Sequence, residues 1–192
     1  MGADYATNPL IFLLQFLFGA YTLVVLLRFF LQLTRADFYN PLSQFIVKIT
    51  SPVLVPLRRF IPSMGGMDIA ALVLAWALKT LELLLVVLIS TGAFAPGFAI
   101  IGAIPGLIEL CINIFLYGII IQAILSWVSP GTYNPAAALL HNLTAPVLRP
   151  VQRFIPPIGG IDLSPMAAIL GLIVLKMLIL PPLNQLVAAS VS

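Results

Sequence analysis

Four long stretches of the chain consist almost entirely of apolar residues, and no other feature restricts its possible folds so strongly. These stretches run, with approximate boundaries, over residues 10–33, 69–94, 106–128 and 163–187. A helix crosses the hydrocarbon core of a bilayer with about 20 apolar residues, so each stretch predicts one transmembrane helix. Asn8 followed by Pro9 is a helix-start signal ahead of the first stretch.

The composition favours the same class of protein. Apolar residues make up 61% of the chain and charged residues only 8%, whereas a soluble domain carries about 25% charged residues. We therefore expect an all-α integral membrane protein. The connection 91–106 is uncharged and rich in Pro and Gly, so we expect it to be irregular or interfacial. Pro181 and Pro182 predict a kink or an end in the last span.

The basic residues predict how the spans are oriented. Between the first two spans and between the last two, the basic residues are Arg35, Lys48, Arg58, Arg59, Arg149 and Arg153. Positively charged loops stay on the cytoplasmic side of a membrane. We expect both basic segments to be cytoplasmic, and both termini and the connection 91–106 to lie on the opposite, periplasmic side.

The chain also contains an internal repeat. Residues 39–68 and 133–162 align with a constant offset of 94 and are identical at 15 of 30 positions. The repeat divides the chain into units 1–94 and 95–192, each a span, a basic connector (35–68 or 129–162) and a second span. Two spans in each unit predict a parallel repeat with a pseudo-twofold axis along the membrane normal.

Each connector is expected to contain an amphipathic helix lying in the headgroup plane. Leu42, Phe45, Ile46 and Ile49 have the spacing of one helix face. The prolines at 52, 56 and 62 are expected to break the helix into short pieces. The residues expected to cap helices, two for the connectors and two for the spans that follow, are Asn40, Asp68, Asn134 and Asp162.

Four connector arginines could bind phosphate groups. They are Arg58, Arg59, Arg149 and Arg153. Arginine is suited to the phosphates of anionic lipid or of a phosphate-bearing partner. The alternative is that these residues serve only to fix the topology.

Four charged residues lie within the predicted spans. They are Lys79, Glu82, Glu109 and Lys176. An unpaired charge at the bilayer centre costs about 2.5 to 3.5 kcal/mol on insertion scales. Two positive and two negative side chains at similar depth predict a buried ion-pair network. The alternative is an ion or proton path. Arg28 lies near the end of the first span, where it could snorkel to the surface.

Neither catalysis nor a cofactor is indicated. His141 is the only histidine and lies outside the spans, and Cys111 is the only cysteine. A structural metal site needs about four ligands, and the sequence offers no such cluster. No Gly-rich phosphate-binding loop has the required spacing. We expect no enzyme activity, no cofactor, no metal and no direct binding of nucleic acid.

The repeated motif NP…PVLxPxxRFIPxxGGxD resembles that of the YggT family of bacterial membrane proteins, also called YlmG. The segment TRADFYNPLSQFIVKITSPVLVPLRRFIP resembles the proteobacterial branch in particular. The resemblance implies an inner-membrane protein whose relatives are associated with osmotic-stress tolerance, cell-division gene neighbourhoods, plastid nucleoid arrangement and cytochrome maturation. The family tends to carry an Arg late in the first span of each unit. This chain has Arg28 in the first unit but Gln122 in the second.

Two functions are compatible with these features. The first is a non-catalytic protein that organises membrane components or assists their assembly, with anionic lipid headgroups and an unidentified membrane protein as partners. The second is a small ion transporter or channel element that uses the charges within the spans. Four spans seldom enclose a conduit, so transport would require a homo-oligomer.

Overall fold

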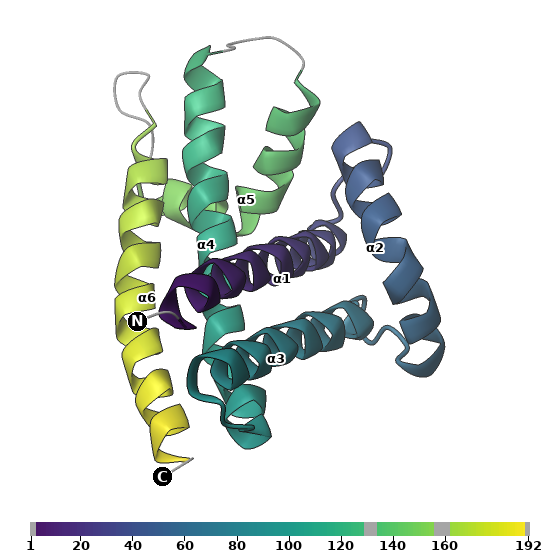
Figure 1. The fold of residues 1–192 in the computed structure, drawn as a ribbon. Helices are drawn as coiled ribbons and strands as arrows, with labels where there is room; N and C mark the ends of the chain where they lie inside the picture. Colours follow the sequence, from purple (N-terminus) through teal and green to yellow (C-terminus); the bar gives the residue numbers. More distant parts are fainter. Residues whose placement is uncertain (1–2, 129–133, 156–161, 191–192) are drawn as a thin grey trace.

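The computed structural model describes residues 3–128, 134–155 and 162–190. Within these ranges the chain forms six α-helices (Figure 1). They are α1 (Ala3–Leu33), α2 (Pro41–Phe60), α3 (Ile69–Thr91), α4 (Pro96–Val128), α5 (Pro135–Phe154) and α6 (Ser164–Ala189). The described residues contain no β-strand beyond a single bridge between Met64 and Met67.

Four of the helices are long and apolar enough to cross a membrane. The segments that qualify are Asn8–Leu33, Ile69–Thr91, Pro96–Ser126 and Ser164–Ala189. They lie in α1, α3, α4 and α6, and α2 and α5 connect them in pairs. The expected class, an all-helical protein with four spans, is confirmed, and the chain is a multi-pass membrane protein.

Three boundaries differ from the sequence predictions, because the helices include prolines that were expected to begin, interrupt or end them. α4 begins at Pro96, so the prediction of an irregular segment over 91–106 is wrong and only residues 92–95 separate it from α3. α1 runs through Asn8 and Pro9, and α6 runs through Pro181 and Pro182 to Ala189. Backbone groups within a membrane must be hydrogen-bonded internally, which favours continuing a helix over breaking it at a proline.

The two connector helices are also unbroken, which corrects the prediction of short pieces. α2 and α5 have 20 residues each, with Pro52 and Pro56 inside α2. Each proline removes only one amide donor. Every fourth residue of α2 from Ile46 to Leu54 is buried, namely Ile46, Thr50 and Leu54. This packing holds the helix together around the prolines.

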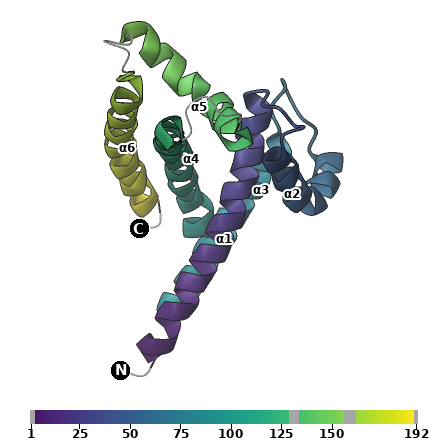
Figure 2. The same ribbon diagram turned by 90° about the horizontal axis from the view of Figure 1, so that it is seen from above.

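The spans pack in two pairs, α1 with α3 and α4 with α6, and α4 also packs on α3 (Figures 1 and 2). The connectors α2 and α5 contact each other, and Asn40 Nδ2 donates to the Pro135 carbonyl across 2.6 Å. Both connectors therefore lie at the same end of the bundle. In a twofold arrangement the contact of α3 with α4 would be matched by a contact of α6 with α1. Among the described residues α6 makes no close contact with α1, so the helix contacts do not follow a strict twofold symmetry.

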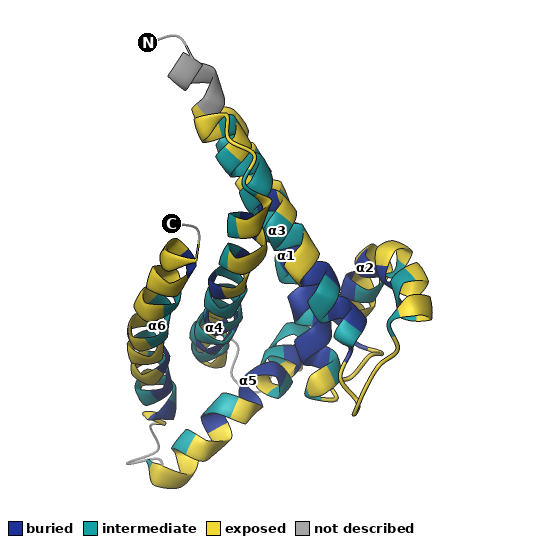
Figure 3. Cartoon of the chain, turned by 90° about the horizontal axis from the view of Figure 1, so that it is seen from below, coloured by how far each residue is buried: buried dark blue, intermediate teal, exposed yellow. Residues whose placement is uncertain are grey.

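Buried residues concentrate where α1 meets α2 and α3 (Figure 3). Val25, Leu26 and Leu54 are almost completely buried there. A smaller core joins α4, α5 and α6 around Ile119 and Leu148. Phe30 of α1 meets Phe115 of α4 edge to face, with ring centroids 4.8 Å apart, and this contact joins the two halves of the protein.

Candidate functional site

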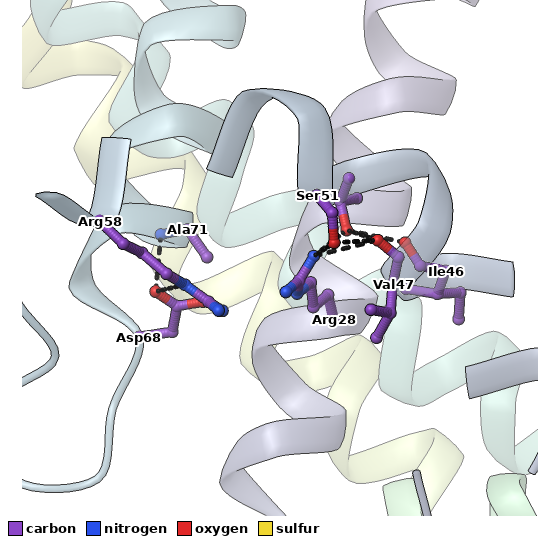
Figure 4. A network of polar contacts seen from close by, with 8 residues as sticks. Arg28, Ile46, Val47, Ser51, Arg58, Asp68 and Ala71 are labelled. Carbon is purple, nitrogen blue, oxygen red and sulfur yellow. Dashed lines mark hydrogen bonds and ion pairs between the residues drawn. The ribbon is translucent and has the colours of Figure 1, made fainter. Parts of the chain in front are cut away.

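The first polar cluster ties α1 to α2 through Arg28 (Figure 4). Arg28 is only 6% exposed, so the prediction that it snorkels to the surface is wrong. Its Nη1 donates to Thr50 Oγ1 at 2.6 Å and to Ser51 Oγ at 3.1 Å. It also donates to the Val47 carbonyl at 3.2 Å. Polar residues of α2 thus face inward and accept hydrogen bonds from the buried guanidinium. These hydrogen bonds are needed because burying a charge without partners is costly.

A second cluster joins the end of α2 to the start of α3. Arg58 Nη2 forms a close ion pair with Asp68 Oδ2, and its Nε donates to Asp68 Oδ1 at 3.3 Å, so the contact is bidentate. Asp68 is 1% exposed, and its Oδ1 accepts the Ala71 amide at the N-cap of α3 (Figure 4). Arg58, one of the four arginines predicted to contact phosphate, is therefore bound within the protein.

The second half of the chain has the same contacts with neutral partners. Thr144, the residue 94 positions after Thr50, donates through Oγ1 to Gln122, which stands at the position of Arg28. Gln152 stands at the position of Arg58, and its Nε2 donates to Asp162 Oδ2 at 3.0 Å. Arg28 and Arg58 are thus each replaced in the second half by a glutamine that contacts the equivalent residue.

The predicted capping residues all accept backbone amides, with one change of position. Asn40 accepts from Leu42 and Asn134 from Ala136, both at 2.9 Å. Asp162 accepts from the Ser164 amide at 2.9 Å, but Leu163 holds the N-cap position of α6 and makes no side-chain capping bond. Asp162 therefore stands one residue earlier than predicted, because α6 begins at Ser164.

The environment of Asp162 favours its charged form. Partial desolvation acts to raise the pKa of this carboxyl, but hydrogen bonds from Ser164 and Gln152 outweigh that effect. The pKa of Asp162 consequently lies below its ordinary value. Since the ordinary pKa of an aspartate is about 3.9, the group is ionised at neutral pH.

The four charged residues within the spans form two separate pairs. Lys79 Nζ lies 2.7 Å from Glu82 Oε1 within α3. Lys176 Nζ lies 2.7 Å from Glu109 Oε1 and 3.2 Å from Asn113 Oδ1, joining α6 to α4. α3 and α6 make no close contact among the described residues, so these pairs do not join directly into one network. The side chain of Glu82 is 4% exposed, whereas that of Glu109 is 45% exposed.

Gly106 leaves room for Lys79 to reach across α4. A Cβ atom at Gly106 would lie 2.8 Å from Cε of Lys79. We expect Gly106→Ala to displace that flexible side chain from Glu82 and to leave the protein about 1 kcal/mol less stable than Gly171→Ala, which gains the same helix propensity without the clash. Gly171→Ala is the matched control, since nothing lies within 4 Å of a Cβ at that position. Thermal unfolding in detergent would compare the two, and equal stabilities would contradict this account of Gly106.

Three of the predicted phosphate-binding arginines remain available. Arg59, Arg149 and Arg153 are exposed, and none has an acidic partner among the described residues. Arg149 and Arg153 line a cavity of about 300 Å³ together with Asn142 of α5 and Thr34, just past α1. Two guanidinium groups one turn apart in such a cavity can bind a phosphate group.

The two connector helices present different surfaces. In α2 the outward residues include Phe45, Ile49 and Val53, which are 60%, 37% and 42% exposed. In α5 the outward residues include His141 and the two arginines, while its leucines are mostly buried. The apolar stripe predicted for α2 therefore faces away from the protein, apart from Ile46. An outward apolar face is typical of a helix embedded at a membrane surface.

A family model described as CCB3/YggT matches residues 7–89 and again residues 101–183. The chain belongs to the CCB3/YggT family. Each position of the first match to this family stands 94 residues before its counterpart in the second, which is the offset of the repeated motif. No solved structure matches this member of the family.

Several bacterial relatives of this CCB3/YggT chain match over most of its length. An uncharacterized protein of Pseudomonas aeruginosa is 48% identical over 173 residues, covering 88% of this chain and 87% of the relative. The YggT protein of Escherichia coli K12, also described as uncharacterized, is 43% identical over 170 residues, 88% of each chain. YlmG homolog protein 2 of Arabidopsis thaliana, described as chloroplastic, is 36% identical over 85 residues, 42% of this chain and 32% of the relative.

The polar contacts beneath the connectors were not predicted from the sequence of this CCB3/YggT chain. The alignment of the two units pairs Arg28 with Gln122 and Thr50 with Thr144. If both members of a contacting pair differed between the two units, the joint change would have indicated the contact. Here only the arginine differs, and the threonine is the same in both units. In the described ranges no group of three or more His, Cys, Asp or Glu residues lies together.

Proposed function

We propose that this protein is a non-catalytic component of the bacterial inner membrane that organises other membrane components or assists their assembly. One observation carries the proposal. Arg149 and Arg153 line a cavity at the connector end of the bundle and have no acidic partner in the described part of the chain. This anion-binding cavity would hold the phosphate of an anionic headgroup or of a membrane-bound partner.

The surface of α2 supports the same proposal. Its apolar residues face outward, so the helix would be seated in the headgroup region beside α5. A basic residue near an anionic membrane surface contributes about 1 kcal/mol of attraction. Osmotic-stress tolerance and cell division are the settings that the YggT resemblance suggests for such an organising role.

The test compares two arginine variants in native membranes. Arg149→Gln combined with Arg153→Gln should lose the partner proteins that crosslinking and affinity purification recover with the unchanged protein. Arg35→Gln is the matched control, because Arg35 is exposed but does not line the cavity. The same double variant should bind phosphatidylglycerol in nanodiscs more weakly by about 2 kcal/mol, at about 1 kcal/mol for each arginine. Unchanged partners and unchanged lipid binding would contradict the proposal.

The proposed topology places both connectors in the cytoplasm and both termini in the periplasm. Six basic residues in the connector segments 35–68 and 129–162 motivate it, since the termini carry none. We expect an alkaline phosphatase fused after Ser192 to be active and a green fluorescent protein fused there to be dark. A fluorescent fusion with inactive phosphatase would show the opposite orientation.

Ion transport is the second candidate function, and the charges within the spans favour it. Glu82 Oε2 is buried and has no hydrogen-bond partner among the described residues. A cavity of about 420 Å³ between α3, α4 and α6 is lined by Lys79, Glu109 and Asn184, among others. Proton or cation flux into proteoliposomes that disappears in Glu82→Gln would support this function. Flux at the level of empty liposomes would exclude it.

A further inference from the structure

A third cavity, larger than the two described above, lies in the second half of the protein and shares no lining residue with the anion-binding cavity. It has a volume of about 750 Å³ and lies between α4, α5 and the first turns of α6. Ile119 and Leu148 form its buried floor, and Met166 and Leu170, 59% and 57% exposed, form one wall. Gln122 and Asp162 add polar groups to the lining. The cavity is therefore a mainly apolar groove that includes an acidic group.

The equivalent space in the first half is filled by side chains. Val25 and Leu54, the counterparts of Ile119 and Leu148, are completely buried in the core around α1, α2 and α3. Phe29 also belongs to that core and is 7% exposed, but its counterpart is Ala123. The smaller side chain of Ala123 on α4 thus opens in the second half a groove that Phe29 fills in the first half.

The charge at the groove is also unbalanced. In the first half, Asp68 is buried and paired with Arg58. In the second half, Asp162 is exposed and receives only hydrogen bonds from Gln152 and Ser164. Residues 156–161, with the sequence PPIGGI, contain no basic residue that could take the place of Arg58. Asp162 is ionised at neutral pH, and among the described residues it has no basic partner such as its counterpart has.

The length of the groove indicates what kind of apolar group it holds. From Ser164, where α6 begins, to Leu170 a helical rise of about 1.5 Å per residue covers about 9 Å. The hydrocarbon core of a bilayer is about 30 Å thick, so the groove extends through one leaflet only. A partner's transmembrane helix would require a groove across both leaflets, whereas a single lipid matches one leaflet, with its headgroup near the acidic end.

We infer that this groove binds one lipid with a primary ammonium headgroup. The ammonium donates to the Asp162 carboxylate, as Arg58 does to Asp68, and an acyl chain lies beside Ala123 and covers the exposed Met166 and Leu170. The lipid supplies both the cation and the apolar volume that the second half of the protein lacks. This inference does not depend on the anion-binding cavity, which uses different residues on another part of α5.

Native mass spectrometry of the full-length protein would test it. Phosphatidylethanolamine would be compared with phosphatidylcholine, whose quaternary ammonium has no N–H donor, and with phosphatidylglycerol, which has no cation. We expect one phosphatidylethanolamine to be retained with about tenfold preference over phosphatidylcholine, the ratio for one charge-assisted hydrogen bond. Equal retention of the two, or stronger retention of phosphatidylglycerol in the groove, would overturn the inference.

Three variants assign the binding to the groove. Asp162→Asn should abolish the tenfold preference, and Gln152→Arg should do the same by supplying the cation from within the protein. Ala123→Phe should expel the lipid by filling the groove as Phe29 does in the first half. Asp37→Asn is the matched control, because Asp37 is an exposed connector carboxylate outside the groove. Loss of the preference in Asp37→Asn as well would count against the site.

The oligomeric state separates a lipid from a second copy of the chain. The inference requires that Gln152→Arg keep the oligomeric state of the unchanged protein and at least its melting temperature while losing the preference for phosphatidylethanolamine. If the unchanged protein is a dimer that Ala123→Phe dissociates, the groove is an interface between copies and the lipid site is refuted. The phosphatidylglycerol measurement on Arg149 and Arg153 variants tests the proposed function separately.

Discussion

Replacing Glu82 with glutamine while Lys79 is kept should lower the free energy of unfolding by about 3 to 5 kcal/mol, the cost of removing one partner from a buried ion pair. Glu82 is almost fully buried within α3, and its Oε1 lies 2.7 Å from Lys79 Nζ. Without the carboxylate, the ammonium group would remain in a low-dielectric region with no opposite charge. Reversible unfolding of the purified protein in mixed detergent micelles would measure the change.

A double-mutant cycle separates the ion pair from other effects of the substitutions. Glu82→Gln combined with Lys79→Met should cost less than the sum of the two single changes, because no unpaired charge remains. Glu82→Gln combined with Lys176→Met is the control and should be additive, since Lys176 pairs with Glu109 on another helix. Additive losses in both combinations would show that the Lys79–Glu82 contact does not contribute to stability.

The spans could be predicted from sequence because their signal is local. Twenty or more apolar residues predict a transmembrane helix whatever the rest of the chain does, and α3 begins at Ile69 as expected. The start of α4 was missed because Pro96 and Pro105 were interpreted as helix breakers. Pro96 is instead the first residue of α4, where proline is favoured. Gly92, with a φ of 72°, ends α3, so a tight turn replaces the expected irregular segment.

The polar contacts could not be predicted because they depend on how the chain folds back. Arg58 and Asp68 are ten residues apart, on two different helices. They meet because Gly65 and Gly66 adopt φ values of 60° and 81° and reverse the chain beside the Met64–Met67 bridge. Two glycines in sequence indicate a turn, but not which side chains it brings together.

The outward apolar face of α2 illustrates a second limit. Periodicity groups Leu42, Phe45 and Ile49 on one side of the helix but does not say whether that side meets the protein or the membrane. In α2, Arg28 holds Thr50 and Ser51 inward. In α5 the counterpart Thr144 also faces inward and contacts Gln122. The two helices share this inward side, but Leu139 and Leu143 of α5 are buried where Phe45 and Ile49 of α2 are exposed. Whether these apolar positions are covered depends on the helices packed beside them, which periodicity does not reveal.

Replacing Arg58 with glutamine should lower the free energy of unfolding by about 3 to 5 kcal/mol, although glutamine is the residue found at the equivalent position 152. The difference lies in the burial of the acidic partner. Asp68 is 1% exposed and would keep a buried charge with no cation, whereas Asp162 is exposed. Amide hydrogen exchange at the first turn of α3 would show whether the loss begins at the helix that Asp68 caps.

Two further variants test that explanation. Arg58→Gln combined with Asp68→Asn should recover most of the stability, because an asparagine keeps the capping oxygen for Ala71 without a charge. The reciprocal change, Gln152→Arg, creates an ion pair at an exposed carboxylate and should add about 0 to 1 kcal/mol. If Arg58→Gln changes the free energy of unfolding as little as Gln152→Arg does, burial of Asp68 does not determine the strength of this contact. The contact at the end of the connector would then contribute equally within each half, despite the different charges.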